Sequence, residues 1–253
     1  MPAEKISFPG SLGRLAARLD LPDSAPRAVA LFAHCFTCSK EGRAATFIAR
    51  ALVERGVALL RFDFTGLGGS EGDFGNTGFS SNVADLVAAA AWLRAERGPP
   101  AILIGHSLGG SAALAAAGEI PECRAVVTLN APFSPDHVTR QFRDSLKLIE
   151  GDGAAEVTLG GRTFRLRKAF LDDLAGQRPA QRIANLRRAL LVMHAPTDTV
   201  VGIDNAQSIF TAAKHPKSFV ALDGDHLLSR PEDASYAAEV LVAWASRFLP
   251  GDR

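Results

Sequence analysis

The residues Gly105-His106-Ser107-Leu108-Gly109 place a serine between two glycines, one two positions before it and one two positions after it. A serine hydroxyl needs a nearby base and a geometry that presents Oγ to a substrate. A sharp strand-to-helix turn gives that geometry, but backbone segments approach so closely there that only small residues fit at the two flanking positions. Because the apolar run Ala101 to Ile104 precedes the motif and an alanine-rich stretch follows it, we predict that Ser107 is a nucleophile. The alternative is a glycine-rich turn whose serine merely caps a helix.

A serine of this kind is followed along the chain first by an acid and then by a histidine. We predict His226 as the base, since it lies in a loop directly after the apolar run Ser218 to Leu222. We predict Asp198 as the acid, because it lies in the loop after the run Ala189 to Met193. Its carboxylate would fix the imidazole tautomer and stabilise the imidazolium. Loops at the carboxyl ends of parallel strands are where such sheets place functional groups.

Three other acids are rivals for the role of Asp198. Asp204 precedes Asn205-Ala206 and suits a helix N-cap. Asp225 adjoins His226 in sequence, which is poor geometry for a side-chain pair, and Asp136 follows an earlier strand. These positions favour Asp198.

The remaining histidines have other expected places. His215 lies between a predicted helix and the following strand, on the opposite rim of the sheet, and reads as a surface residue. His194 and His106 flank strand ends and are expected to be structural or to support the site from behind. We also place His106, with Cys35 and Phe164, among the residues predicted to contact the substrate.

A tetrahedral intermediate at Ser107 would carry a negative oxygen that needs two N–H donors. The amide of Leu108, directly after the nucleophile, is predicted as one donor. The second is predicted at the amide of Phe36, in the loop that follows the early apolar run Ala28 to Ala33. The alternative is that Phe36 only lines the pocket, and the two roles are compatible.

The elements that must position these residues alternate between apolar runs and helical patterns. The apolar runs without polar alternation predict buried strands at 28–33, 57–62, 101–104, 125–129, 189–193 and 218–222. Helical patterns occupy residues 42–55, 80–97, 111–118, 204–214 and 234–248. Residues 5–20 read as a hairpin at the sheet edge. The alternation predicts an α/β fold with a mostly parallel central sheet and helices on both faces.

Residues 132–188 separate two predicted strands by far more than one helix needs. Glu156 to Leu159, Gly160-Gly161 and Arg162 to Arg165 form a hairpin pattern, and residues 168–175 read as a helix. A long insertion in a compact domain is typical of a lid or of a disordered linker. The hairpin favours an ordered cap at about 132–188 within a single domain spanning 1–253.

The composition describes a neutral enzyme-like chain, with 253 residues, 47% hydrophobic content and a net charge of +1. No basic stripe indicates nucleic-acid binding, no run of about 18 apolar residues indicates a membrane span, and no secretory signal begins the chain. The expected location is therefore cytoplasmic. Three cysteines, Cys35, Cys38 and Cys123, are an odd number and predict free thiols in a reducing compartment.

Cys35 and Cys38 also form a C-x-x-C pattern, the spacing of redox and zinc motifs. No second Cys or His pair follows at zinc spacing, so we expect no metal. Redox use is not favoured either, because Phe36-Thr37 lies between the two cysteines, where an oxyanion donor is predicted.

Several segments together resemble the α/β-hydrolase (serine aminopeptidase S33-like, Hydrolase_4) family, and most of all the hydrolase domain of bacterial α/β-hydrolase–OsmC fusion proteins. These segments are LFAHCFTCSK (31–40), RFDFTGLGGSEGDF (61–74), LIGHSLGG (103–110), PTDTVVGIDNA (196–206) and HPKSFVALDGDHLLSR (215–230). The resemblance implies a triad of Ser107, Asp198 and His226. The residues His34-Cys35-Phe36 also resemble the His-Gly-Phe sequence of feruloyl-esterase-type hydrolases, and the hairpin-bearing lid of those enzymes resembles residues 132–188.

The chain departs from this family in two places. Many relatives carry glycine where this chain has Cys35, and a side chain there narrows the loop that presents the Phe36 amide. The chain also ends at Arg253, soon after the last predicted helix, so we expect no OsmC domain and no peroxidase activity.

Together these features predict a serine hydrolase that cleaves short-chain or aromatic carboxylic esters through an acyl-enzyme, with neither metal nor organic cofactor. An amidase or peptidase, or a thioesterase or acyltransferase, would use the same triad, and a non-catalytic receptor on the same scaffold is a further alternative. The expected partner is a small-molecule ester, without nucleic acid or membrane, and a homodimer stays open.

Overall fold

The main sheet of the computed structural model, which describes residues 2–249, has eight strands. Their order across the sheet is β1 (Ala3–Pro9), β2 (Arg14–Asp20), β4 (Val57–Phe62), β3 (Ala28–Ala33), β5 (Ile102–His106), β6 (Ala125–Leu129), β9 (Ala189–His194) and β10 (Lys217–Ala221). Strand β2 pairs antiparallel with β1 and β4, and every other neighbouring pair is parallel. The predicted edge hairpin and mostly parallel sheet are confirmed.

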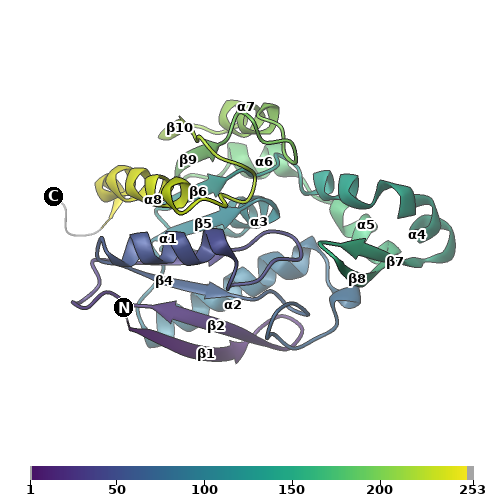
Figure 1. The fold of residues 1–253 in the computed structure, drawn as a ribbon, viewed down its shortest axis with the longest axis horizontal. Helices are drawn as coiled ribbons and strands as arrows, with labels where there is room; N and C mark the ends of the chain where they lie inside the picture. The colour runs from purple at the N-terminus through teal and green to yellow at the C-terminus, as the bar shows by residue number, and fades with distance from the viewer. Residues whose placement is uncertain (1, 250–253) are drawn as a thin grey trace.

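Helices cover both faces of this sheet, as the absence of polar alternation in its central strands predicts (Figure 1). Helices α1 (Arg43–Val53) and α8 (Pro231–Ala245) pack together on one face. Helices α2 (Phe79–Glu96), α3 (Leu108–Ala116) and α7 (Asp204–Ala212) pack on the other. A short 3-10 helix, η3 (Ser246–Phe248), follows α8. The sheet therefore has two separate apolar layers, and the loops at the carboxyl ends of its strands meet along one edge.

The long connection between β6 and β9 is folded rather than linker-like. It contains η2 (Pro135–Ser145), α4 (Leu146–Asp152), β7 (Ala154–Leu159), β8 (Arg162–Arg167), α5 (Lys168–Ala175) and α6 (Pro179–Ala184). Strands β7 and β8 form a separate antiparallel sheet, and Figure 1 shows it projecting away from the main sheet. The predicted hairpin is confirmed, with Gly160 and Gly161 both at positive φ in its turn.

The prediction of three free thiols is wrong for two of them. Cys35 and Cys38 form a disulfide, with their Cα atoms 5.3 Å apart. A turn closed by the hydrogen bond from the Cys38 amide to the Cys35 carbonyl, at 3.2 Å, brings the two side chains together. Cys123 is free and buried. The inference of a reducing compartment, which depended on free thiols, therefore loses its basis.

Two element boundaries also differ from the prediction. Strand β5 continues to His106, and helix α3 begins at Leu108 rather than at residue 111. Only Ser107 separates strand from helix, so the turn is tighter than the residue pattern suggests. Among the described residues, none of the helices has the length and apolar character needed to cross a membrane.

Candidate active site

Ser107 lies on the tight turn between β5 and α3, with φ 54° and ψ −128°. We call residues 105–110 the elbow. A Cβ on Gly105 would lie 2.2 Å from the Gly109 carbonyl oxygen, and a Cβ on Gly109 would lie 2.3 Å from the Ala33 carbonyl oxygen. Both distances are far below van der Waals contact. Glycine is therefore required at both positions by backbone-to-backbone approach, as the motif predicts.

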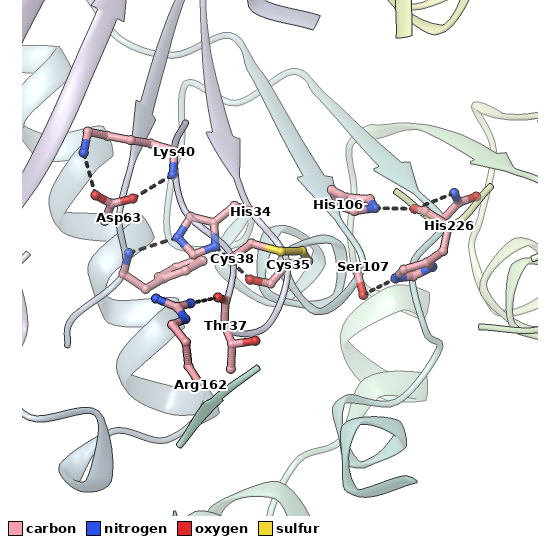
Figure 2. The surroundings of a disulfide bond; sticks show 12 residues. His34, Cys35, Thr37, Cys38, Lys40, Asp63, His106, Ser107, Arg162 and His226 are labelled. Carbon is pink, nitrogen blue, oxygen red and sulfur yellow. Dashed lines mark hydrogen bonds and ion pairs between the residues drawn. A yellow bond between two sulfur atoms is a disulfide. The ribbon is translucent and has the colours of Figure 1, made fainter. Parts of the chain in front are cut away.

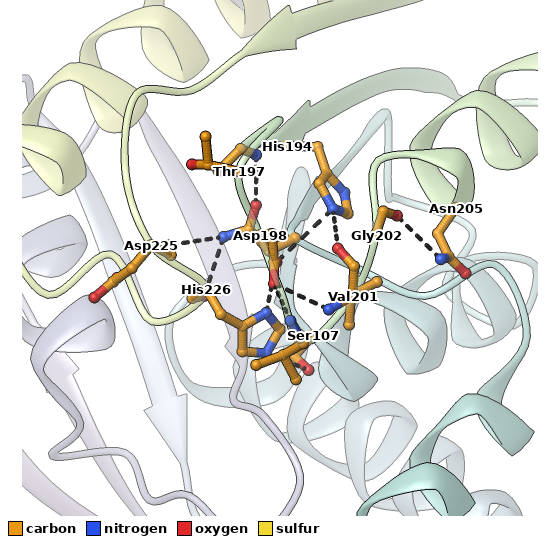
Figure 3. Close-up of polar contacts among 12 residues, drawn as sticks. Ser107, His194, Thr197, Asp198, Val201, Gly202, Asn205, Asp225 and His226 are labelled. Atoms are coloured by element: carbon orange, nitrogen blue, oxygen red, sulfur yellow. Dashed lines mark hydrogen bonds and ion pairs between the residues drawn. The ribbon is translucent and has the colours of Figure 1, made fainter.

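His226 joins Ser107 to Asp198 (Figure 3). Its Nε2 lies 3.1 Å from Ser107 Oγ, and its Nδ1 lies 2.7 Å from Asp198 Oδ2. His226 stands in the loop between β10 and α8, and Asp198 in the loop after β9. The structure thus brings together the three residues that were predicted from different segments of the chain.

Asp198 is held as a carboxylate by several donors. Its Oδ1 accepts hydrogen bonds from the amides of Val200 at 2.8 Å and Val201 at 2.9 Å. Burial acts to raise the pKa of Asp198, but the hydrogen bonds from His226 and from these amides outweigh it and lower the pKa below its ordinary value. The ionised carboxylate fixes Nδ1 of His226 as the protonated nitrogen and leaves Nε2 facing Ser107.

The His226 loop is anchored by two side chains behind it. His106 Nε2 donates to the His226 carbonyl at 2.7 Å, and Asn130 Nδ2 donates to the same oxygen at 3.0 Å. Asn130 Oδ1 also accepts from the Ala195 amide at 2.8 Å, so this residue links the loops after β6, β9 and β10. Asn130 was not among the predicted residues. Its position directly after a buried strand, at the functional edge of the sheet, is the signal that could have found it.

The other predicted histidines and acids lie in supporting or distant positions. His194 is buried beneath Asp198, and its Nε2 donates to the Val201 carbonyl at 2.7 Å. Asp204 begins α7 rather than capping it, and the Asp225 side chain accepts from the Ser229 amide instead of from His226. His215 lies beside the amino end of β10, at the opposite edge of the sheet.

The predicted second oxyanion donor lies in residues 34–40, which we call the oxyanion loop. His34 is buried, and its Nδ1 donates to the Cys35 carbonyl at 2.8 Å while its Nε2 accepts from the Phe64 amide at 3.3 Å. Burial lowers the pKa of His34, which keeps the imidazole neutral and fits one donor and one acceptor nitrogen. Within residues 2–249, the amides of Phe36 and Leu108 donate no hydrogen bond to protein, as oxyanion donors require.

The three predicted substrate contacts divide into two places. Cys35 and His106 line one cavity of about 260 Å³. Phe164 lies instead on the β7–β8 hairpin, with its ring 4.7 Å from that of Phe74. The Phe74 ring in turn lies 5.6 Å from that of Phe36, so the hairpin reaches the oxyanion loop through a series of tilted aromatic contacts. Phe164 therefore belongs to the aromatic cluster that packs against the oxyanion loop, and it lies apart from the cavity at Cys35.

Solved structures similar to this chain include the two described next. The esterase domain of a Rhodothermus marinus protein is 49% identical, with a TM-score of 0.77, and the match covers 98% of this chain and 99% of that one. Est1E from Butyrivibrio proteoclasticus, solved with bound ferulic acid, is 20% identical, with a TM-score of 0.80 and coverage of 94% and 98%. At that identity, the second likeness shows the fold alone.

Curated sequences and family profiles give the broader placement. The uncharacterized protein YfhR of Salmonella typhimurium is 26% identical over 181 residues, which are 70% of this chain and 57% of that protein. The chain thus spans little more than half the length of this relative. The profile of the alpha/beta hydrolase family matches residues 30–250. With its parallel sheet, its glycine-flanked Ser107 and this match over most of its length, the chain belongs to the alpha/beta hydrolase family.

Proposed function

We propose that this chain is a serine hydrolase that cleaves carboxylic esters, with Ser107 as nucleophile, His226 as general base and Asp198 as the acid that orients it. The observation that carries the proposal is the continuous hydrogen-bonded series in which His226 lies 3.1 Å from Ser107 Oγ and 2.7 Å from Asp198. Such a series gives a weak hydroxyl nucleophile the base that it needs.

In the proposed reaction, Ser107 Oγ attacks the ester carbonyl carbon while His226 Nε2 takes its proton. The amides of Leu108 and Phe36 hold the resulting oxyanion. Collapse of the tetrahedral intermediate releases the alcohol, which receives its proton from His226, and leaves an acyl group on Ser107. Water, deprotonated by the same His226, then attacks the acyl-enzyme and releases the acid.

An ester is the favoured substrate because a relative that is 49% identical over nearly the whole chain is an esterase domain. We propose short-chain or aromatic acyl groups as the substrates, with no metal or organic cofactor taking part. Substrate contacts by Cys35 and His106, which line one cavity, and by Phe164, which lies apart from it on the β7–β8 hairpin, belong to the same proposal as two separate places. We also propose, from the sequence motifs, that the chain belongs to the S33-like subfamily and within it resembles the hydrolase domain of the OsmC fusion proteins. A cytoplasmic location and a role of residues 132–188 as a cap are further parts of this proposal.

The test compares turnover of p-nitrophenyl acetate and butyrate with turnover of aminoacyl-nitroanilides and acyl-CoA thioesters. We expect the nitrophenyl esters to be hydrolysed fastest. Ser107→Ala should lower kcat by about 10³-fold or more, because it removes the nucleophile. Ser235→Ala, at a partly buried serine on α8, is the matched control and should retain full activity.

A fluorophosphonate probe separates an inactive protein from a wrong substrate class. It should label wild-type protein and the Ser235→Ala variant, and it should not label the Ser107→Ala variant. Faster turnover of anilides or CoA esters would replace the esterase by an amidase or a thioesterase. A folded wild-type protein that resists the probe would overturn the nucleophile itself.

A further inference from the structure

The Cys35–Cys38 disulfide lies inside the oxyanion loop (Figure 2). In the sequence, the two cysteines enclose the proposed donor Phe36. The two cysteines bracket Phe36 and Thr37, and Thr37 has a φ of 60°, in the left-handed region that a non-glycine residue rarely adopts. A covalent link across this turn restricts the backbone on both sides of the Phe36 amide. The orientation of that amide thus depends partly on the bond between the two sulfur atoms.

The disulfide also borders open space. A cavity of about 260 Å³ is lined by Cys35 and Cys38 together with Arg43, His106, Leu227 and Ser229. A water molecule occupies about 30 Å³ in the liquid, so this space admits a small organic molecule. Cys38 is partly exposed, whereas Cys35 is 7% exposed, so of the two cysteines Cys38 is the more open to an incoming reagent.

The surroundings of the cavity favour an anionic sulfur. Arg43 contributes a cation, and the first turn of α1 borders the same space through Gly42, Arg43 and Ala44. Cations and helix amino-terminal ends stabilise thiolates, the reactive form in exchange with disulfides. Cys123 has the opposite environment, because it is buried and this burial raises the pKa of its thiol to about 12. The Cys35–Cys38 pair and Cys123 thus lie in opposite environments.

We propose that Cys35–Cys38 is a thiol–disulfide exchange site that takes a low-molecular-weight thiol from this cavity, and that its reduction slows ester hydrolysis at Ser107. The second half rests on the proposed function. The first half depends only on the cavity and on the exposure of Cys38.

The exchange has two balanced steps. A small thiolate attacks Cys38 Sγ, the Cys35–Cys38 bond breaks, and Cys35 leaves as a thiolate that takes up a proton. A second small thiol, as its thiolate, attacks the mixed disulfide at the small-molecule sulfur, which releases Cys38 as a thiol and forms the oxidised small disulfide. In sum, two thiols are oxidised and the protein disulfide is reduced to two thiols.

Reduction would leave the oxyanion loop with fewer restraints. The carbonyl of Cys35 would keep its hydrogen bond from His34, and that of Thr37 would keep its contact with the Arg162 guanidinium. Without the covalent link, the Phe36 amide between them is freer to turn away. Loss of a single oxyanion donor lowers kcat by about 10² to 10³-fold, so a loosened donor should lower kcat by about tenfold, with a smaller change in KM.

The exchange itself is tested on the folded protein by incubation with 2-mercaptoethanol, followed by quenching and alkylation with N-ethylmaleimide. We expect mass spectrometry to find adducts on Cys35 and Cys38 and none on Cys123, without denaturant. In a parallel reduced sample that is not alkylated, removal of the thiol and addition of oxidised 2-mercaptoethanol should restore the disulfide. Adducts that form only in denaturant would overturn the exchange site and show an inert structural bond.

The effect on catalysis is tested with p-nitrophenyl acetate in both redox states. Wild-type protein and the Cys123→Ala variant should each lose about tenfold in kcat on reduction, whereas a Cys35→Ser/Cys38→Ser variant should have the lower kcat in both states. Equal kcat in the two states of wild type would overturn the inference and leave the proposed esterase standing. Absence of turnover and of fluorophosphonate labelling in both states would overturn the esterase and this catalytic effect together, and alkylation would still decide the exchange site.

Discussion

The elbow and the oxyanion loop lie side by side, but they are held in different ways. The elbow is shaped by close backbone approach, because Gly105 and Gly109 permit contacts within the elbow and with Ala33 of β3 that any side chain would block. The Ser107 amide donates to the Leu129 carbonyl at 2.9 Å, and the Gly110 amide donates to the Ser107 carbonyl at 2.8 Å. These bonds come from residues within the motif or from the adjacent strand.

The oxyanion loop, by contrast, is held by partners from distant parts of the chain. The carboxylate of Asp63, which is buried, accepts from the Lys40 amide at 2.6 Å and from Lys40 Nζ at 2.5 Å. The Phe64 amide donates to His34, and Arg162 of the β7–β8 hairpin donates to the Thr37 carbonyl. The comparison indicates that the nucleophile is positioned locally, whereas its oxyanion donor is positioned by the whole fold and is open to adjustment.

The largest expected effect comes from breaking the elbow. Gly105→Ala places a Cβ 2.2 Å from the Gly109 carbonyl oxygen, so strand and helix must separate and displace Ser107. A displacement of about 1 Å can lower kcat by about 100-fold, and overpacking lowers the free energy of unfolding by about 1 to 3 kcal/mol. Ester turnover and urea unfolding measure the two quantities.

Gly118→Ala is the matched control for this substitution. A Cβ on Gly118 meets no heavy atom within 4 Å, so activity should be unchanged and stability should stay within about 0.5 kcal/mol of wild type. If Gly105→Ala behaved like this control, backbone contact would not be what shapes the elbow.

A smaller effect is expected from the buried histidine in the elbow. Burial, with the charge of His226, lowers the pKa of His106 from 6.5 to about 4. Between those values the unfolded chain binds a proton at His106 that the folded chain does not. The contribution of neutral His106 to the free energy of unfolding is therefore fully present above pH 6.5 and is lost as the pH decreases toward 4. We expect His106 to contribute a loss of about 1 to 2 kcal/mol between pH 7 and pH 5.

His106→Gln tests this contribution, since glutamine keeps an N–H donor for the His226 carbonyl but does not titrate. Urea unfolding at pH 7 and pH 5 should show a smaller loss of stability for the variant than for wild type. Burial also lowers the pKa of His34 in the oxyanion loop, so part of the pH dependence should persist in the variant. An unchanged loss in His106→Gln would assign the whole dependence to other groups.

The same contrast explains what could be predicted from the sequence. The strands, the edge hairpin and the elbow follow from apolar runs and glycine spacing, which are local signals. The positions of Asp198 and His226 follow from chain order in a parallel sheet, and the structure brings both to Ser107. These features depend on residues that are close in sequence or on a topology rule.

The missed features depend on tertiary contacts. Cys35 and Cys38 were predicted as free thiols because cysteine counting ignores the turn that joins them. Asn130 was missed because its function is to connect three loops that meet only in the folded chain. The Arg162 contact to Thr37 spans 125 residues, and no local pattern encodes it. The restraints of the oxyanion loop are therefore the part of the site that is hardest to predict from the sequence.

The smallest expected effect comes from removing one of those distant restraints. Arg162 is exposed, so Arg162→Ala should lower kcat/KM for p-nitrophenyl acetate by only about two- to threefold and change stability by less than about 0.5 kcal/mol. Arg165→Ala, at an exposed arginine of the same strand, should have no effect on kcat/KM.

The size of the Arg162 effect should depend on the neighbouring disulfide. In the Cys35→Ser/Cys38→Ser background, the guanidinium contact to Thr37 is one of the few remaining restraints on the loop, so its loss should lower kcat/KM more than it does in wild type. Such non-additivity is expected when two groups restrain one segment, and a double-mutant cycle measures it directly. Additive effects would mean that the two restraints act on the loop independently, and that the Phe36 amide is positioned by the His34 and Asp63 contacts instead.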